Sequence, residues 1–170
     1  MYKRQDTFQY VHEYNLSTPY DISTRTYAGN DERCELGSGS DGHSGNQAHD
    51  LEFSNDGMKL FTSDKTTDIL FRFDLTSPYD VSTCSFVYET TTVDTPALQN
   101  GSNAGTKGTN TRLQGFEISE DGKKLFLLFH DSGGDPSRLH EYNLSTPFDL
   151  RTLSLVTSAG IKLPSAHVAN

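Results

Sequence analysis

The ten residues HEYNLSTPYD at positions 12–21 return almost unchanged as HEYNLSTPFD at positions 140–149. A third copy, FRFDLTSPYD, lies between them at positions 71–80. Successive copies are therefore about 60 to 70 residues apart. An internal period of this kind is typical of a repeat architecture in which each copy is one supersecondary unit.

A second repeated element precedes the later two copies: NDGMKLF at 55–61 recurs as EDGKKLF at 120–126. Apolar and polar residues alternate along 69–75, which predicts a strand with one buried face, and no helical stripe appears. The Asp-Gly pairs predict tight two-residue hairpins in which both positions accept a positive φ.

Each complete repeat is interpreted as four antiparallel strands, which is the blade of a β-propeller. We expect strands near residues 50–54, 59–63, 69–76 and 85–90 in the second repeat, and near 115–119, 124–130, 139–145 and 153–157 in the third. The predicted fold is thus an all-β propeller of about three blades. Its expected divisions are a partial first blade (1–28), a second blade (48–92), a third blade (113–158), and the start of an inner strand (159–170).

Three blades do not close a ring, and unpaired strands at a sheet edge recruit another chain. We therefore expect the protein to associate with itself, most simply as a homodimer with a six-bladed ring in which residues 159–170 help to complete a blade of the partner. The alternative is that the chain is a fragment of a longer propeller. Both descriptions are compatible.

The composition limits the partners. The 170 residues carry a formal net charge of −9, with 14 Lys and Arg against 23 Asp and Glu, which argues against nucleic acid as a ligand. No apolar run is long enough for a membrane span, and residues 1–6 do not resemble a signal peptide, so neither a membrane partner nor a leader is expected. Cys34 and Cys84 have no metal-ligand spacing and are expected to be free thiols, with the redox compartment undetermined.

The motifs resemble the repeats of bacteriophage and marine-microbial propellers, in which F-S-x-D-G-x-K-M-Y precedes Y-x-L-S-T-P-W-D-V-S-T. The matching segments here are 53–61 and 73–83, with Tyr or Phe in place of the Trp. More distantly the chain is similar to YVTN-type and lactonase-like propellers, although none of their catalytic motifs is present to carry over. The resemblance implies architecture but says almost nothing about activity. The location stays undetermined for a soluble protein, and a virion-associated or extracellular one is compatible with the sequence.

Two groups of residues are candidate sites. The polar connections 28–47 and 92–111 are expected on one face, where they either bind a protein or glycan or are solvated insertions. The inner strands are expected to bring a ring of polar side chains to the mouth of the central channel, where they either hold a metal or polar ligand or line a water-filled channel. These channel-mouth residues are His49, Asp50, Gln114 and His167. His43 and Asp41 are weaker metal candidates, with calcium or another divalent ion as the ligand.

His12 and His140 fall on the core face of their strands and are expected to be packed histidines rather than catalytic bases. The leading hypothesis is a non-enzymatic binding and assembly module with no cofactor. The alternatives are a lactonase-like or hydrolase-like enzyme with a metal at the channel, and a propeller fragment without independent function.

Overall fold

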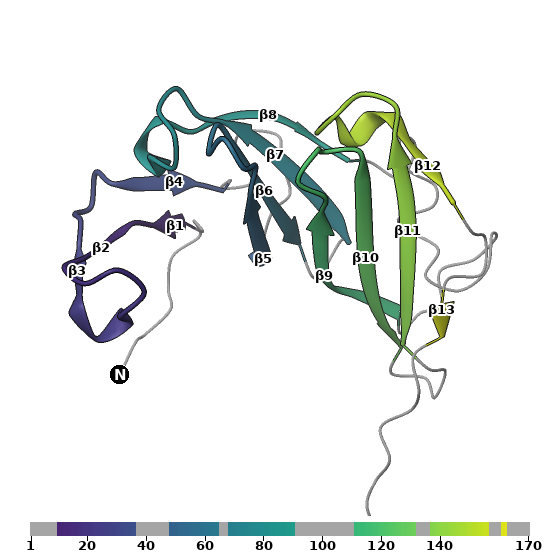
Figure 1. The fold of residues 1–170 in the computed structure, drawn as a ribbon, viewed down its shortest axis with the longest axis horizontal. Helices are drawn as coiled ribbons and strands as arrows, with labels where there is room; N and C mark the ends of the chain where they lie inside the picture. The colour runs from purple at the N-terminus through teal and green to yellow at the C-terminus, as the bar shows by residue number, and fades with distance from the viewer. Residues whose placement is uncertain are drawn as a thin grey trace, which may run out of the picture.

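The computed structural model describes residues 10–36, 48–64, 68–90, 111–131, 137–156 and 161–162. Figure 1 shows three successive units along an arc, from the purple amino-terminal end to the yellow carboxyl-terminal end. In these residues the chain consists of antiparallel strands and three one-turn 3₁₀ helices. The architecture is a partial β-propeller of about three blades, as the repeat predicts.

The second blade is a four-stranded antiparallel sheet. Its strands pair in the order β5 (Ala48–Phe53), β6 (Lys59–Asp64), β7 (Ile69–Asp74) and β8 (Ser85–Glu89). Five consecutive residues of β6, from Leu60 to Asp64, are buried, because this central strand is covered by other units on both faces. The observed strands start and end within about two residues of the predicted ones.

The third blade repeats this order with β9 (Thr111–Ile118), β10 (Lys124–Asp131), β11 (Arg138–Leu144) and β12 (Leu153–Leu155). A short strand, β13 (Ile161–Lys162), also pairs with β11, through Ile161 opposite Leu139. These two residues therefore extend the outer edge of the third blade, whereas the sequence places 159–170 in an inner strand. Residues 163–170 lie outside the described residues.

The first unit corresponds to the third and fourth strands of a blade. β1 (Tyr10–His12) and β2 (Tyr14–Leu16) form one strand that is interrupted at Glu13. β2 pairs with β3 (Arg25–Tyr27), and β1 pairs with β4 (Arg33–Glu35), as β7 pairs with β8. The unit extends past residue 28 because β4 pairs with β1.

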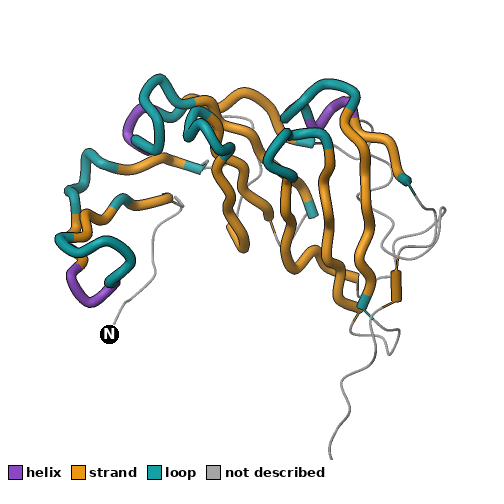
Figure 2. The backbone as a smooth tube through the Cα atoms, in the orientation of Figure 1, coloured by secondary structure: helices purple, strands orange, loops and turns teal. Residues whose placement is uncertain are grey.

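The repeated turn after the third strand has one conformation in all three copies. Its aromatic residue is left-handed, with φ of 64° at Tyr20, 61° at Tyr79 and 61° at Phe148. The next residue, always Asp, caps a 3₁₀ turn and accepts a hydrogen bond from the backbone two residues later. These turns are η1 (Ile22–Thr24), η2 (Val81–Thr83) and η3 (Leu150–Thr152), coloured purple in Figure 2.

The Asp-Gly hairpin and the aromatic turn are packed together. Tyr79 donates its backbone N–H to the Gly57 carbonyl at 2.9 Å, and its ring lies over Gly57 so closely that a Cβ there would stand 2.5 Å from Cδ2. Phe148 covers Gly122 in the same way. The prediction that both hairpin residues take a positive φ is wrong. Only the glycine does, at 68° in Gly57, because Asp56 instead uses its carboxylate to accept from Ser54 and from the Met58 N–H.

The hydrophobic core lies between the units rather than within any one sheet. One cluster joins the first unit to the second blade, including Val11, Leu36, Phe71 and Phe73. The other joins the second blade to the third, including Phe61, Leu70, Leu113, Leu125, Tyr142 and Leu150. Each blade is therefore stabilised mainly by its neighbours.

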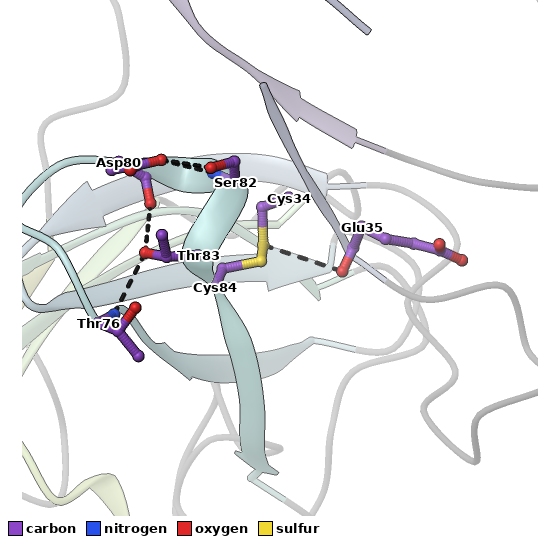
Figure 3. The surroundings of a disulfide bond; sticks show 7 residues. All are labelled: Cys34, Glu35, Thr76, Asp80, Ser82, Thr83 and Cys84. Atoms are coloured by element: carbon purple, nitrogen blue, oxygen red, sulfur yellow. Dashed lines mark hydrogen bonds between the residues drawn. A yellow bond between two sulfur atoms is a disulfide. The ribbon is translucent and has the colours of Figure 1, made fainter. Parts of the chain in front are cut away.

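A disulfide also joins the first unit to the second blade. Cys34 on β4 is bonded to Cys84 at the end of η2, with Cα atoms 5.7 Å apart (Figure 3). The expectation of two free thiols is wrong. Cysteine spacing along the chain did not indicate the bond because the two residues come from different repeats, which only the packing of the units brings together.

Candidate functional site

Carboxylates of the second blade bind the inner edge of the third. Asp50 Oδ2 accepts the Phe116 N–H at 3.0 Å, and Glu52 Oε2 accepts the Ile118 N–H at 2.8 Å. Asp68 Oδ1 accepts the Leu113 N–H at 2.7 Å. These N–H groups lie on the edge of β9 that pairs with no further strand among the described residues. The acidic side chains therefore accept the hydrogen bonds that a neighbouring strand would accept in a wider sheet.

Three of the predicted channel-mouth residues lie together at this edge. His49 Nδ1 is 3.0 Å from the backbone oxygen of Gln114, and Asp50 follows His49 on β5. His167, His43 and Asp41 lie outside the described residues. A ligand at the channel mouth stays a prediction, and the described contacts give His49 and Asp50 a role in joining two blades.

Glu52 is the titratable group of this edge whose pKa is moved most. Burial raises its pKa to about 7, and the nearby charges of Glu117 and Asp50 act in the same direction, against the hydrogen bond from Ile118. Sequence reasoning missed Glu52 and Asp68. The signal for Glu52 was present, because it stands two residues after Asp50 and so shares its face of the strand.

A pocket of about 460 Å³ lies between the first unit and β5. Its walls combine hydroxyl, imidazole and carboxylate groups with apolar side chains. It is lined by Tyr10, Val11, His12, Tyr14, Leu36, Ala48, His49, Asp50 and Leu51. This mixture of aromatic surface and convergent polar groups is typical of ligand pockets.

The two histidines that were expected to be packed in the core differ in burial. His140 is buried and meets the Phe129 ring edge-on, as expected for a core histidine. His12 is exposed and is held by the Tyr27 hydroxyl at 3.2 Å from Nδ1. The expectation that His12 is buried is wrong, because in the described residues no blade covers that face of the first unit.

Three carboxylates, from Glu13, Glu32 and Asp80, meet between the first unit and the second blade with ligand atoms within 4.8 Å of one another. Glu13 Oε2 is buried without a hydrogen-bond partner. The Asp80 carboxylate is already engaged by Ser82 at the start of η2. No sequence motif marks this cluster, because Glu13, Glu32 and Asp80 come from three separate segments of the chain.

Comparison with known proteins supports the fold alone. No family model matches the chain, and none of the curated proteins matches it. Among solved structures, the chain is similar to the crystal structure of a protein from Lactobacillus plantarum, a structural-genomics target, with a TM-score of 0.54 and 16% identity. The match covers 89% of this chain and 35% of the other, so the chain spans about a third of that protein's length. The phage-type resemblance has no counterpart among these matches and stays a prediction.

The connections expected to form a loop face, 28–47 and 92–111, fall largely outside the described residues. Among the residues that are described, no helix has the length and apolar character needed to cross a membrane.

Proposed function

We propose that the chain is a non-enzymatic β-propeller module that supplies about three blades to a larger ring and associates with a second copy to form six blades. One observation carries the proposal. Tyr14 and Leu16 of the first copy are exposed. The equivalent residues of the later copies are buried between blades, namely Phe73 and Leu75 in the second and Tyr142 and Leu144 in the third. A protein that leaves such a face uncovered has a large apolar patch of the kind that marks an interaction site.

The ligand face of the module is proposed to recognise a protein or a glycan. The pocket between the first unit and β5 supports this, because Tyr10 offers aromatic surface beside the polar groups of His49 and Asp50. Tyrosine is suited to such recognition, since its ring packs while its hydroxyl forms hydrogen bonds.

The disulfide supports the proposed extracellular or virion-associated location. Disulfides persist where thiols are kept oxidised and are rare in the cytosol. The Cys34–Cys84 bond joins two units whose strands belong to separate sheets, so an oxidising compartment would help to keep the first unit in place.

The oligomeric state tests the proposal most directly. Sedimentation equilibrium under non-reducing conditions is expected to give a species with twice the 18.8 kDa mass of one chain. A folded protein that remains monomeric at concentrations up to hundreds of micromolar would exclude self-association as its function.

A second candidate function is a hydrolase with a metal at the channel. The observation in its favour is that His12, His49 and Asp50 line one pocket. If it is right, protein purified without chelators contains stoichiometric metal that is lost on His49→Ala. If the module proposal is right, His49→Ala changes no metal content and weakens only the contact with Gln114.

A further inference from the structure

We infer that the two copies meet head to tail: a leading face of Tyr14, Leu16 and Ile22 on one copy packs against a trailing face of Phe126, Leu128 and Leu139 on the other. The inference rests on the proposed self-association and specifies its geometry. Each face is the repeat equivalent of one side of the contact between the second and third blades.

The leading face is recognised by comparing equivalent positions of the repeat. Tyr14 is 51% exposed, whereas its counterpart Tyr142 is 0% exposed. Ile22 is 74% exposed, and its counterpart Leu150 is 0% exposed. Leu16 is exposed while Leu75 and Leu144 are buried. In the later copies these positions are covered by the preceding unit, so the first copy presents a surface shaped to receive one.

The trailing face is found by the reverse comparison. In the second blade, Phe61, Ser63 and Leu70 face the third blade and are buried. The repeat aligns them with Phe126, Leu128 and Leu139 of the third blade, which are only half-buried. Leu128 replaces a serine, so this face is more apolar than its internal counterpart.

The contact between the second and third blades shows what such a pair of faces forms. Apolar side chains from both sheets make one cluster, and Tyr88 accepts the Leu150 N–H at 2.8 Å through its hydroxyl. Arg72 donates to the Phe148 carbonyl at 3.3 Å. The first unit offers the same acceptor at Tyr20, in a turn with the same left-handed φ. The third blade carries Glu141 where the second carries Arg72, so the two faces match at their apolar positions and not at this hydrogen bond. This apolar match makes a second copy the occupant that we propose.

The two faces are different surfaces, so their contact is heterologous. A two-fold rotation turns one such contact into two, with each leading face on the other copy's trailing face, and the ring closes. An isologous dimer, in which leading face meets leading face, would instead leave both trailing faces exposed.

Two charge substitutions distinguish these arrangements. Ile22→Lys damages the leading face, and Leu128→Lys damages the trailing face. In a head-to-tail ring each variant alone carries two damaged contacts and is expected to bind itself at least tenfold more weakly than the wild type. An equimolar mixture regains one intact contact, between the trailing face of Ile22→Lys and the leading face of Leu128→Lys, so a heterodimer at least tenfold tighter than either homodimer is expected.

Val87→Lys is the matched control, because Val87 is an exposed apolar residue of β8 on neither face. It should dimerise as the wild type does, and far-UV circular dichroism should show that all three variants keep the wild-type secondary structure. If Leu128→Lys dimerises normally, or if mixing restores nothing, the head-to-tail contact is wrong while self-association stands. If the wild type is monomeric, both proposals fail.

Discussion

The first and third copies of the repeat differ by one residue in ten, Tyr20 against Phe148, yet their environments are opposite. Tyr142 lies in the core between two blades, whereas Tyr14 faces outward. The turn has the same backbone in both, including the left-handed aromatic residue and the Asp-capped 3₁₀ turn. This segment therefore encodes its turn by itself, while its burial depends on which unit precedes it.

The largest expected difference between the copies is at the tyrosine. Tyr142→Ala removes a fully buried ring and is expected to lower the free energy of unfolding by about 4 kcal/mol. Tyr14→Ala is expected to lower it by less than about 1 kcal/mol in dilute protein, because an exposed ring loses little packing. Urea denaturation of both variants measures this difference. Equal losses would show that the first copy is as well covered as the third.

The disulfide is the second difference, because it anchors the first copy and has no equivalent at the third. Cys84→Ser removes a crosslink between residues 50 apart in sequence and is expected to lower the free energy of unfolding by about 3 kcal/mol. The loss should be concentrated in the first unit, so hydrogen exchange in residues 10–36 should rise while exchange in β10 and β11 stays slow. Uniform loosening of the chain would contradict separate anchoring of the first unit.

A third difference concerns the hairpin at Gly122, which the Phe148 ring covers in the third copy. Gly122→Ala places a Cβ 2.4 Å from Phe148 Cδ2 at a φ of 69°, which is expected to lower the free energy of unfolding by about 2 kcal/mol. The double variant Gly122→Ala with Phe148→Ala separates the two causes, since it removes the clash but keeps the backbone strain. Thermal denaturation of the single and double variants gives both values.

The smallest effect is a pH dependence at the edge that holds the third blade. Because the pKa of Glu52 is about 7 in the folded protein and near 4.5 when unfolded, the folded state binds the extra proton between these values. Stability from this group is therefore full below about pH 4.5 and is lost as the pH rises to about 7. Glu52→Gln keeps an acceptor for the Ile118 N–H and should flatten the slope. An unchanged slope would assign it to other groups.

The sequence was sufficient for the strands and their order. The period-two pattern along 69–75 and the repeated DG and SPYD turns are local signals, and each reports a local conformation that neighbours do not change. The same locality explains why most bounds of β5 to β12 lie within about two residues of the predicted ones, although β9 starts four residues before the predicted position. The error at the hairpin, where a positive φ was predicted for both Asp56 and Gly57, also has a local cause. The Asp56 carboxylate accepts hydrogen bonds from Ser54 and the Met58 N–H, and this turn needs a positive φ only at the glycine.

The candidate site was less predictable, because it depends on contacts between repeats. His49 and Gln114 lie in contact because the inner strands of adjacent blades start at the same end, whereas a ligand role for the channel-mouth residues stays a prediction. The partners of Asp50 and Glu52 are backbone N–H groups on β9, which carry no sequence signature at all. The Cys34–Cys84 bond and the exposure of His12 were not predicted for the same reason. The bond depends on how two units pack together, and the exposure of His12 depends on whether another unit covers that face.

The bridge between Cys34 and Cys84 has a practical consequence for handling this protein. Both halves of the chain stay covalently linked even if a protease nicks any peptide bond between the two cysteines. Such a nicked molecule would migrate intact on a non-reducing gel and separate into fragments only after thiol treatment, so its integrity is judged correctly only when both gels are run.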